Sequence, residues 1–112
     1  MPPDDRIRIQ HMIEAAESAL GFVSGRSSDD LETDRMLLFA LVRAIEIVGE
    51  AASRISAETR QAITEIPWPA VIGMRNRLVH AYFDINYDTV WKTVTDELPD
   101  LLPRLRAILE AE

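Results

Sequence analysis

The sequence predicts an all-α fold, an antiparallel up-and-down bundle of four to five helices. Apolar residues recur at steps of three and four along almost the whole chain, which is the period of an amphipathic helix, and no stretch alternates as a strand does. The 112 residues also suit a single domain over residues 1–112, because domains typically hold about 100–150 residues. Each helix can be assigned in turn.

The first helix is predicted over residues 4–23. Asp4 and Asp5 stand where the positive end of a helix favours acidic side chains, and Gly25 lies just beyond the predicted end. The residues expected on its buried face are Ile9, Met12, Ile13, Ala16, Ala19, Leu20 and Val23. His11 lies beside this face with no cation that the sequence places near it, so we expect a structural histidine.

The second helix is predicted as one long helix over residues 29–55. Its buried face is expected to contain Leu31, Leu38, Leu41, Val42, Ile45, Val48, Gly49 and Ala52. A second stripe, on a different arc, contains Met36, Phe39, Arg43, Glu46 and Glu50. This stripe is either a solvated face or a surface that packs on a second copy of the chain.

Three further helices complete the prediction. A short one over residues 57–64 is capped by Ser56, and the run Pro67-Trp68-Pro69 then breaks the chain. Pro69 suits the first position of a fourth helix that extends to Val79. The last helix follows the cap Asn86 and runs to Leu109, and its residues Pro99 and Pro103 should kink or split it.

The composition limits the classes of function. The chain has no cysteine and two histidines, so disulfides and thiolate metal sites are excluded and we predict neither a metal site nor a cofactor. We also predict a cytoplasmic location without membrane contact, because a secretory signal and a long apolar span are absent. A net charge of −7 opposes general nucleic-acid binding.

The charge is distributed unevenly. Residues 1–39 carry −4, residues 40–82 carry +1 and residues 83–112 carry −4. A phosphate group would therefore meet least repulsion at the middle third. That third also holds Arg75, Asn76, Arg77, His80 and Tyr82 within eight residues.

These five residues suit cleavage of RNA. A histidine that titrates near neutrality can take the proton of a ribose 2′-hydroxyl or protonate the leaving oxygen, and an arginine can bind the phosphate as charge builds. On an ideal helix Arg75 and His80 lie about 140° apart. Either the helix loosens before His80, or Arg75 reaches around it, or a second subunit completes the site. A structural histidine with surface arginines remains the alternative to any site.

The order of motifs resembles a known family. The segments Ala44-Ile-Glu-Ile-Val-Gly-Glu-Ala-Ala52, Ile66-Pro-Trp68, Gly73-Met-Arg-Asn-Arg-Leu-Val-His-Ala-Tyr-Phe83 and Val90-Trp-Lys-Thr-Val94 closely resemble those of the HepT-like toxins of the HEPN superfamily. The core of the resemblance is Arg75-x4-His80-x-Tyr82, which matches the family pattern R-x4-H-x-Y, and the resemblance covers nearly the whole chain. It implies the helical HEPN fold.

The resemblance also implies a function. Family members are homodimeric, metal-independent RNases, and each is the toxin of a type VII toxin–antitoxin pair. By position, Arg75 and His80 would be catalytic and Asn76 and Arg77 supporting, with RNA as substrate and transfer RNA as one candidate. Tyr82 would be the hydroxyl that an MntA-like nucleotidyltransferase antitoxin AMPylates. The alternative is a non-catalytic HEPN subunit that binds nucleotides or nucleic acid as the partner of a nucleotidyltransferase.

Overall fold

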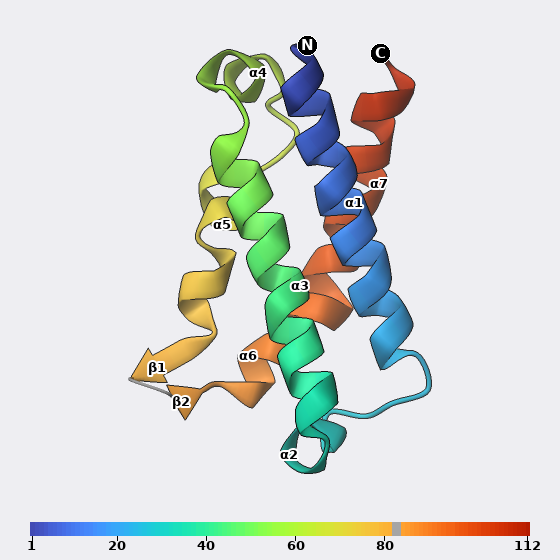
Figure 1. The fold of residues 1–112 in the computed structure, drawn as a ribbon, viewed down its shortest axis with the longest axis vertical. Helices are drawn as coiled ribbons and strands as arrows, with labels where there is room; N and C mark the ends of the chain where they lie inside the picture. Colours follow the sequence, from blue (N-terminus) through green and yellow to red (C-terminus); the bar gives the residue numbers. More distant parts are fainter. Residues whose placement is uncertain (82–83) are drawn as a thin grey trace.

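Three long helices form the body of the protein (Figure 1). They are α1 (Pro3–Val23), α3 (Arg35–Arg54) and α7 (Leu98–Glu110), and both chain termini lie at one end of the bundle. The computed structural model describes residues 1–81 and 84–112, with side chains described for 1–78 and 84–112. The predicted all-α helical bundle is confirmed.

Helix α1 follows its prediction closely. It begins at Pro3, a residue suited to a first turn because its missing N–H would have no partner there, and it carries Asp4 and Asp5 in that turn. It packs along α3 through a buried face that includes the small residues Ala15, Ala16 and Ala19, which permit close approach of the two helices.

The predicted long helix over residues 29–55 is in fact two helices. Asp34 has an extended backbone between α2 (Asp30–Thr33) and α3, and its carboxylate accepts a hydrogen bond from the Leu37 amide at 3.0 Å. Arg26 binds the same side chain at 2.9 Å. Asp34 therefore caps α3, because an aspartate that bonds the backbone at a helix start competes with continuing the helix.

Helix α4 (Ala57–Ala62) starts at its predicted cap and ends two residues before the predicted end. The Ser56 side chain accepts from the Thr59 amide at 3.3 Å. The Asp5 carboxylate of α1 lies against this cap and accepts from the Ser56 amide at 3.0 Å and from the Ser56 and Thr59 hydroxyls at 2.6 Å each. One buried carboxylate thus fixes the start of α4 on α1.

The predicted fourth helix was wrong beyond residue 72. Helix α5 (Trp68–Ile72) contains Pro69 as its second residue, and it is followed by the 3₁₀ turn η1 (Met74–Arg77) and the strand β1 (Val79–Ala81). Strand β1 pairs antiparallel with β2 (Asp84–Ile85), a short hairpin that no alternation of apolar and polar residues in the sequence indicates. The Asn86 amide donates to the Leu78 carbonyl at 2.6 Å, a bond that closes this hairpin.

The C-terminal segment is split, as predicted. The Asn86 side chain caps α6 (Tyr87–Lys92) by accepting from the Thr89 amide at 3.1 Å. A π-helical turn, η2 (Thr93–Glu97), separates α6 from α7, and Pro99 follows in the first turn of α7. The irregular turn lies where the ring of Pro99 would clash with a regular helix, whereas Pro103 lies inside α7.

One apolar cluster joins these elements. Leu41 and Ile45 of α3 are fully buried in a cluster that also contains residues of α1 and α7. Trp68 adds a buried ring whose Nε1 donates to the Ile63 carbonyl at 2.8 Å. Trp91 packs on the same cluster while half-buried, so both tryptophans are packing residues. None of the helices in the described residues has the length and apolarity that a membrane crossing requires.

Candidate functional site

The motif residues lie on the short elements between α5 and α6, beside α3 (Figure 1). Arg75, Asn76 and Arg77 form the exposed part of η1, while Met74 and Leu78 on either side of them are buried. Two apolar anchors therefore hold an exposed polar triplet in place.

The backbone explains how the motif departs from a helix. His80 belongs to β1, so the 140° separation calculated for an ideal helix does not apply. The sequence left open whether the helix loosens before His80, and the backbone does leave the helix before this residue. The His80 side chain is not among those described, and Tyr82 lies outside the described residues.

Close packing positions this segment on α3. A methyl group added at Gly49 would lie 3.3 Å from the Ile72 carbonyl oxygen and 3.4 Å from that of Val71. Such distances are tight for a side chain, so glycine at this position lets the end of α5 approach the backbone of α3. The turn η1 starts two residues after Ile72, so this contact also positions η1 on α3.

Arg75 extends toward α3. Its Nη1 lies 3.7 Å from Oε1 of Glu50, and Arg43 Nη1 lies 3.8 Å from the same oxygen. Glu50 is about half exposed, and one carboxylate oxygen serves both arginines. These separations exceed a good hydrogen bond, so both guanidinium groups keep donors for a further anion.

Arg75 and Asn76 also line a shallow pocket of about 330 Å³. Val42 and Leu78 supply apolar lining, and Glu46 supplies a carboxylate. The pocket combines a cation, an amide and an acid on an apolar base, and these groups can hold a phosphate and the sugar attached to it.

Arg77 extends toward a different neighbour. Its Nη2 lies 3.1 Å from Oε1 of Glu97 in the π-helical turn η2. The other oxygen of Glu97 accepts from the Thr93 hydroxyl at 3.2 Å. The structure therefore brings Arg75 and Asn76 together and separates Arg77 from them, although all three are neighbours in the sequence.

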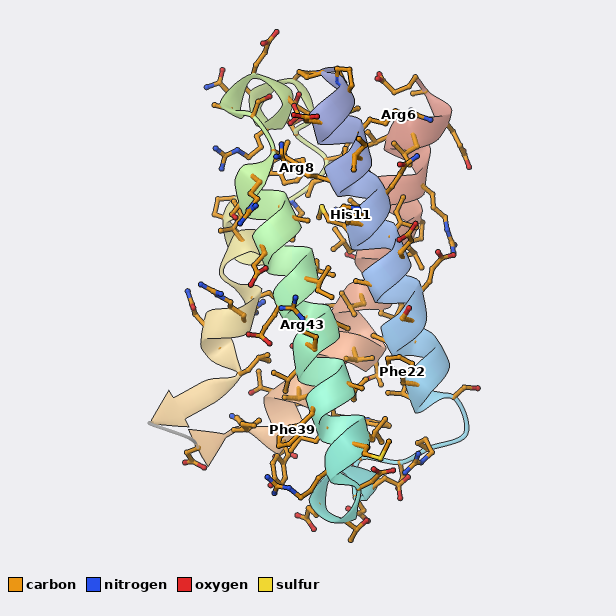
Figure 2. The ribbon with its side chains drawn as sticks, in the orientation of Figure 1. Arg6, Arg8, His11, Phe22, Phe39 and Arg43 are labelled. Atoms are coloured by element: carbon orange, nitrogen blue, oxygen red, sulfur yellow. The ribbon has the colours of Figure 1, made fainter. Side chains whose placement is uncertain are left out.

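The outer stripe predicted on α3 is exposed in the single chain. Met36 is 85% exposed and Phe39 50%, and the Arg35 guanidinium lies 4.9 Å from the centre of the Phe39 ring. Figure 2 shows Phe39 and Arg43 along the face of α3 that is turned toward the viewer. The exposed side chains of Met36 and Phe39 thus lie on the same stripe of α3 as Glu50, which contacts Arg75.

His11 has cationic neighbours that the sequence did not reveal. It is exposed and lines a groove of about 410 Å³ between α1 and α3 together with Arg8, Arg43 and Arg54. Those arginines are distant from His11 in the sequence except Arg8, one turn away on the same helix. The expectation that no cation lies near His11 was therefore wrong. The signal that could have found the groove is the i, i+3 spacing of Arg8 and His11.

Among the described side chains, the most buried charged group lies elsewhere. Asp5 is 2% exposed; burial raises the pKa of its carboxyl, and the hydrogen bonds from Ser56 and Thr59 outweigh this and hold the pKa below 3.8. This cluster stabilises the start of α4. Among the described residues, no group of three or more histidine and acidic side chains is arranged to hold a metal ion.

Comparison with known proteins gives one consistent result. The model of the family described as "Ribonuclease HepT-like" matches residues 12–108. A protein of Caldanaerobacter subterraneus subsp. tengcongensis named "Putative RNase TTE0752" is 36% identical over 104 residues, or 93% of each chain. A protein of Thermococcus cleftensis named "Probable ribonuclease HepT" is 36% identical over 93 residues, covering 83% of this chain and 84% of the relative. No solved structure matches the chain.

Proposed function

The chain belongs to the Ribonuclease HepT-like family, and from this premise we propose that it is an endoribonuclease that cleaves RNA with Arg75 and His80 and without a metal ion. The observation that carries the proposal is the position of Arg75. Its side chain is about half exposed, it lines a pocket with Asn76, and its contact to Glu50 is long enough for a phosphate to compete.

The proposed reaction uses the ribose as nucleophile. The 2′-oxygen attacks the adjacent phosphorus atom, and the bond from phosphorus to the 5′-oxygen of the next nucleotide breaks. One imidazole accepts the proton of the 2′-hydroxyl, and an imidazolium donates a proton to the leaving 5′-oxygen. The products are a 2′,3′-cyclic phosphate and a 5′-hydroxyl. Arg75 donates to the non-bridging oxygens as negative charge builds on them.

The neighbours of Arg75 and His80 have supporting roles in this scheme. Asn76 lines the pocket with Arg75 and can bind the phosphate or orient an imidazole. Arg77 supports the motif differently, because its ion pair with Glu97 ties η1 to η2. Substitution of Asn76 should therefore lower the cleavage rate. Substitution of Arg77 should mainly loosen the packing of η1 on η2.

A homodimer would supply the second imidazole. The reaction needs a base and an acid, and the motif offers one histidine per chain. In the proposed dimer two copies of the motif face each other across a cleft, and the exposed Met36 and Phe39 of α3 are covered by the partner subunit. This arrangement predicts that the isolated monomer is inactive.

The test is cleavage by the purified chain in the presence of EDTA. We expect a mixed RNA substrate to be cleaved, and His80→Ala to lower the rate by about 10²–10⁴-fold while the melting temperature stays unchanged. Arg104→Ala, which removes an exposed arginine of α7 that pairs with Asp100, serves as the control and should retain full activity. Loss of activity in EDTA would contradict the metal-independent mechanism. Binding of RNA without cleavage would favour the non-catalytic partner subunit.

The proposal includes control by an antitoxin. We expect an MntA-like nucleotidyltransferase to transfer AMP to the Tyr82 hydroxyl, which would add negative charge and bulk to the motif that binds RNA. Production of the chain alone should arrest bacterial growth, and Arg75→Ala should relieve the arrest. Coexpression with the cognate nucleotidyltransferase should add AMP to the intact mass, and this addition should disappear in Tyr82→Phe. Additions that persist in that variant would place the modification elsewhere.

A further inference from the structure

The groove between α1 and α3 concentrates arginines on an otherwise acidic protein. Arg8 comes from α1, and Arg43 and Arg54 come from α3. Figure 2 shows Arg8 and His11 on the side of α1 nearest α3, whereas Arg6 lies on the side toward α7. The packing of the two helices creates this surface, on which three arginines outnumber the two acids, Asp4 and Glu50.

These arginines are weakly neutralised. Arg8 lies 4.0 Å from Asp5, whose carboxylate already accepts three hydrogen bonds from Ser56 and Thr59, and Arg43 lies 3.8 Å from Glu50. Arg54 has no salt bridge within the described part of the chain.

Three arginines on other surfaces of the protein are held more closely by acids. Arg26, Arg77 and Arg106 pair with acids at 2.7–3.1 Å. The donors of the groove arginines are therefore available to an external anion.

The groove is linked to the candidate active site through Glu50. Glu50 lines the groove, and its Oε1 contacts both Arg43 and Arg75. The two guanidinium Nη1 atoms lie 3.8 and 3.7 Å from this one oxygen and are therefore within about 7.5 Å of each other. A polyanion bound at Arg75 can meet Arg43 next and then the rest of the groove.

Size and lining indicate the kind of ligand. A volume of about 410 Å³ lies within the range of small-ligand sites, about 300–1,000 Å³. Ile7 and Ile47 provide apolar lining. Among the described residues, no phenylalanine, tyrosine or tryptophan lines the groove, so none of them offers a ring on which a base could stack. Such a surface recognises phosphate and sugar without regard to sequence.

We propose that this groove binds a backbone phosphate of the RNA substrate at a position separate from the bond that is cleaved, with Arg8 and Arg54 as the principal contacts. The proposal rests on the proposed function, because it extends the path of the same RNA. The groove holds the strand, while Arg75 and His80 act on one phosphodiester. An acidic protein thereby binds RNA along one cationic track.

The test measures RNA binding in the full chain carrying His80→Ala, so that the probe stays intact. The probe is a fluorescent single-stranded RNA of about 12 nucleotides, followed by anisotropy from about 50 to 200 mM salt. Arg8→Ala and Arg54→Ala should each weaken binding about fivefold and lower the slope of log Kd against log salt by about 0.7. Arg54→Lys keeps the charge and should keep the slope.

The matched control is Arg6→Ala. It removes the same charge from the same helix outside the groove, so affinity and slope should match those of the parent. Thermal unfolding of each variant separates loss of binding from loss of fold. The proposal would be overturned if both groove variants kept the affinity and salt slope of the His80→Ala parent. It would also be overturned if a mononucleotide displaced the fluorescent RNA as well as unlabelled RNA does at the same phosphate concentration.

The outcomes also separate the groove from the catalytic proposal. If the wild-type chain cleaves RNA and the groove variants keep its KM and salt slope, the groove assignment is wrong and the proposed function stands. If the groove variants weaken binding and no cleavage occurs under any condition, the groove stands and the catalytic assignment is wrong. If the chain binds no RNA, both are wrong.

Discussion

The core of the bundle and the motif segment, which we define as residues 68–86, place their side chains in different ways. In the core, Leu41 and Ile45 are fully buried on a regular helix. In the motif segment a short helix, a 3₁₀ turn and a hairpin follow within nineteen residues and expose Arg75, Asn76 and Arg77. The core sets stability, and the segment offers charge at fixed positions. The two properties should therefore respond to different substitutions.

The largest expected effect concerns the two arginines of the segment. Arg75→Ala removes the proposed phosphate ligand and should lower the cleavage rate about 100-fold or more. Arg77→Ala removes an exposed ion pair with Glu97, worth about 0–1 kcal/mol, and should change the rate by about threefold or less. Initial rates on one RNA substrate check both variants. Equal losses would show that the two arginines act in one site despite their different neighbours.

A substitution in the body of the protein should have the reverse effect. Asp5→Ala leaves the Ser56 and Thr59 hydroxyls without their acceptor and should lower the free energy of unfolding by about 2–3 kcal/mol while the cleavage rate is unchanged. Urea unfolding at one protein concentration measures this. Asp4→Ala, at the neighbouring exposed acid, should cost about 0.5 kcal/mol or less. Similar costs for both would contradict the structural role of Asp5.

The same carboxylate predicts a pH dependence. The folded-state pKa of Asp5 lies below its ordinary value of 3.8, so the unfolded chain takes up this proton first as the pH falls. The stabilisation from Asp5 is complete above about pH 4 and is lost as the pH falls through the folded-state pKa. Unfolding free energies measured from about pH 6 to pH 3 should fall more steeply for the wild type than for Asp5→Asn. Parallel curves would show that Asp5 makes no such contribution.

The smallest effect tests the contact between the two regions. Gly49→Ala places a methyl group against the carbonyls of Val71 and Ile72 and should destabilise the fold by about 1 kcal/mol, despite the better helix propensity of alanine. Gly21→Ala, in α1, meets nothing within 4 Å and should stabilise by about 0.5–1 kcal/mol. Opposite shifts in melting temperature check the pair. A stabilised Gly49→Ala variant would show that α5 can move away from α3 at little cost in free energy.

The sequence predicts the long helices well because burial on one face imposes a period. Helix α1 and the caps Ser56 and Asn86 follow from side chains that act on their own neighbourhood. The break at Asp34 was missed because the apolar spacing of Leu31 and Leu38 continues across it, while the aspartate bonds the Leu37 amide. A single local hydrogen bond outweighed the pattern.

The candidate site was only partly predictable. Leu78 and Val79 continue the spacing of α5, yet the chain forms a 3₁₀ turn and a strand there, closed by the bond between Asn86 and Leu78. The separation of Arg75 from Arg77 follows from Glu50 and Glu97, which are distant in the sequence. The cationic groove likewise depends on the packing of α1 on α3. Tertiary contacts decide which charges meet, and spacing along the chain does not report them.

The central claim is that Arg75 and His80 catalyse attack by the ribose 2′-hydroxyl. The measurement that tests it most directly is the chemistry of the ends produced from a defined RNA in EDTA, read by mass spectrometry. We predict 2′,3′-cyclic phosphate and 5′-hydroxyl ends with the wild-type chain, and no such products with Arg75→Ala or His80→Ala. Fragments with 3′-hydroxyl and 5′-phosphate ends, or the same products from both variants, would contradict the account.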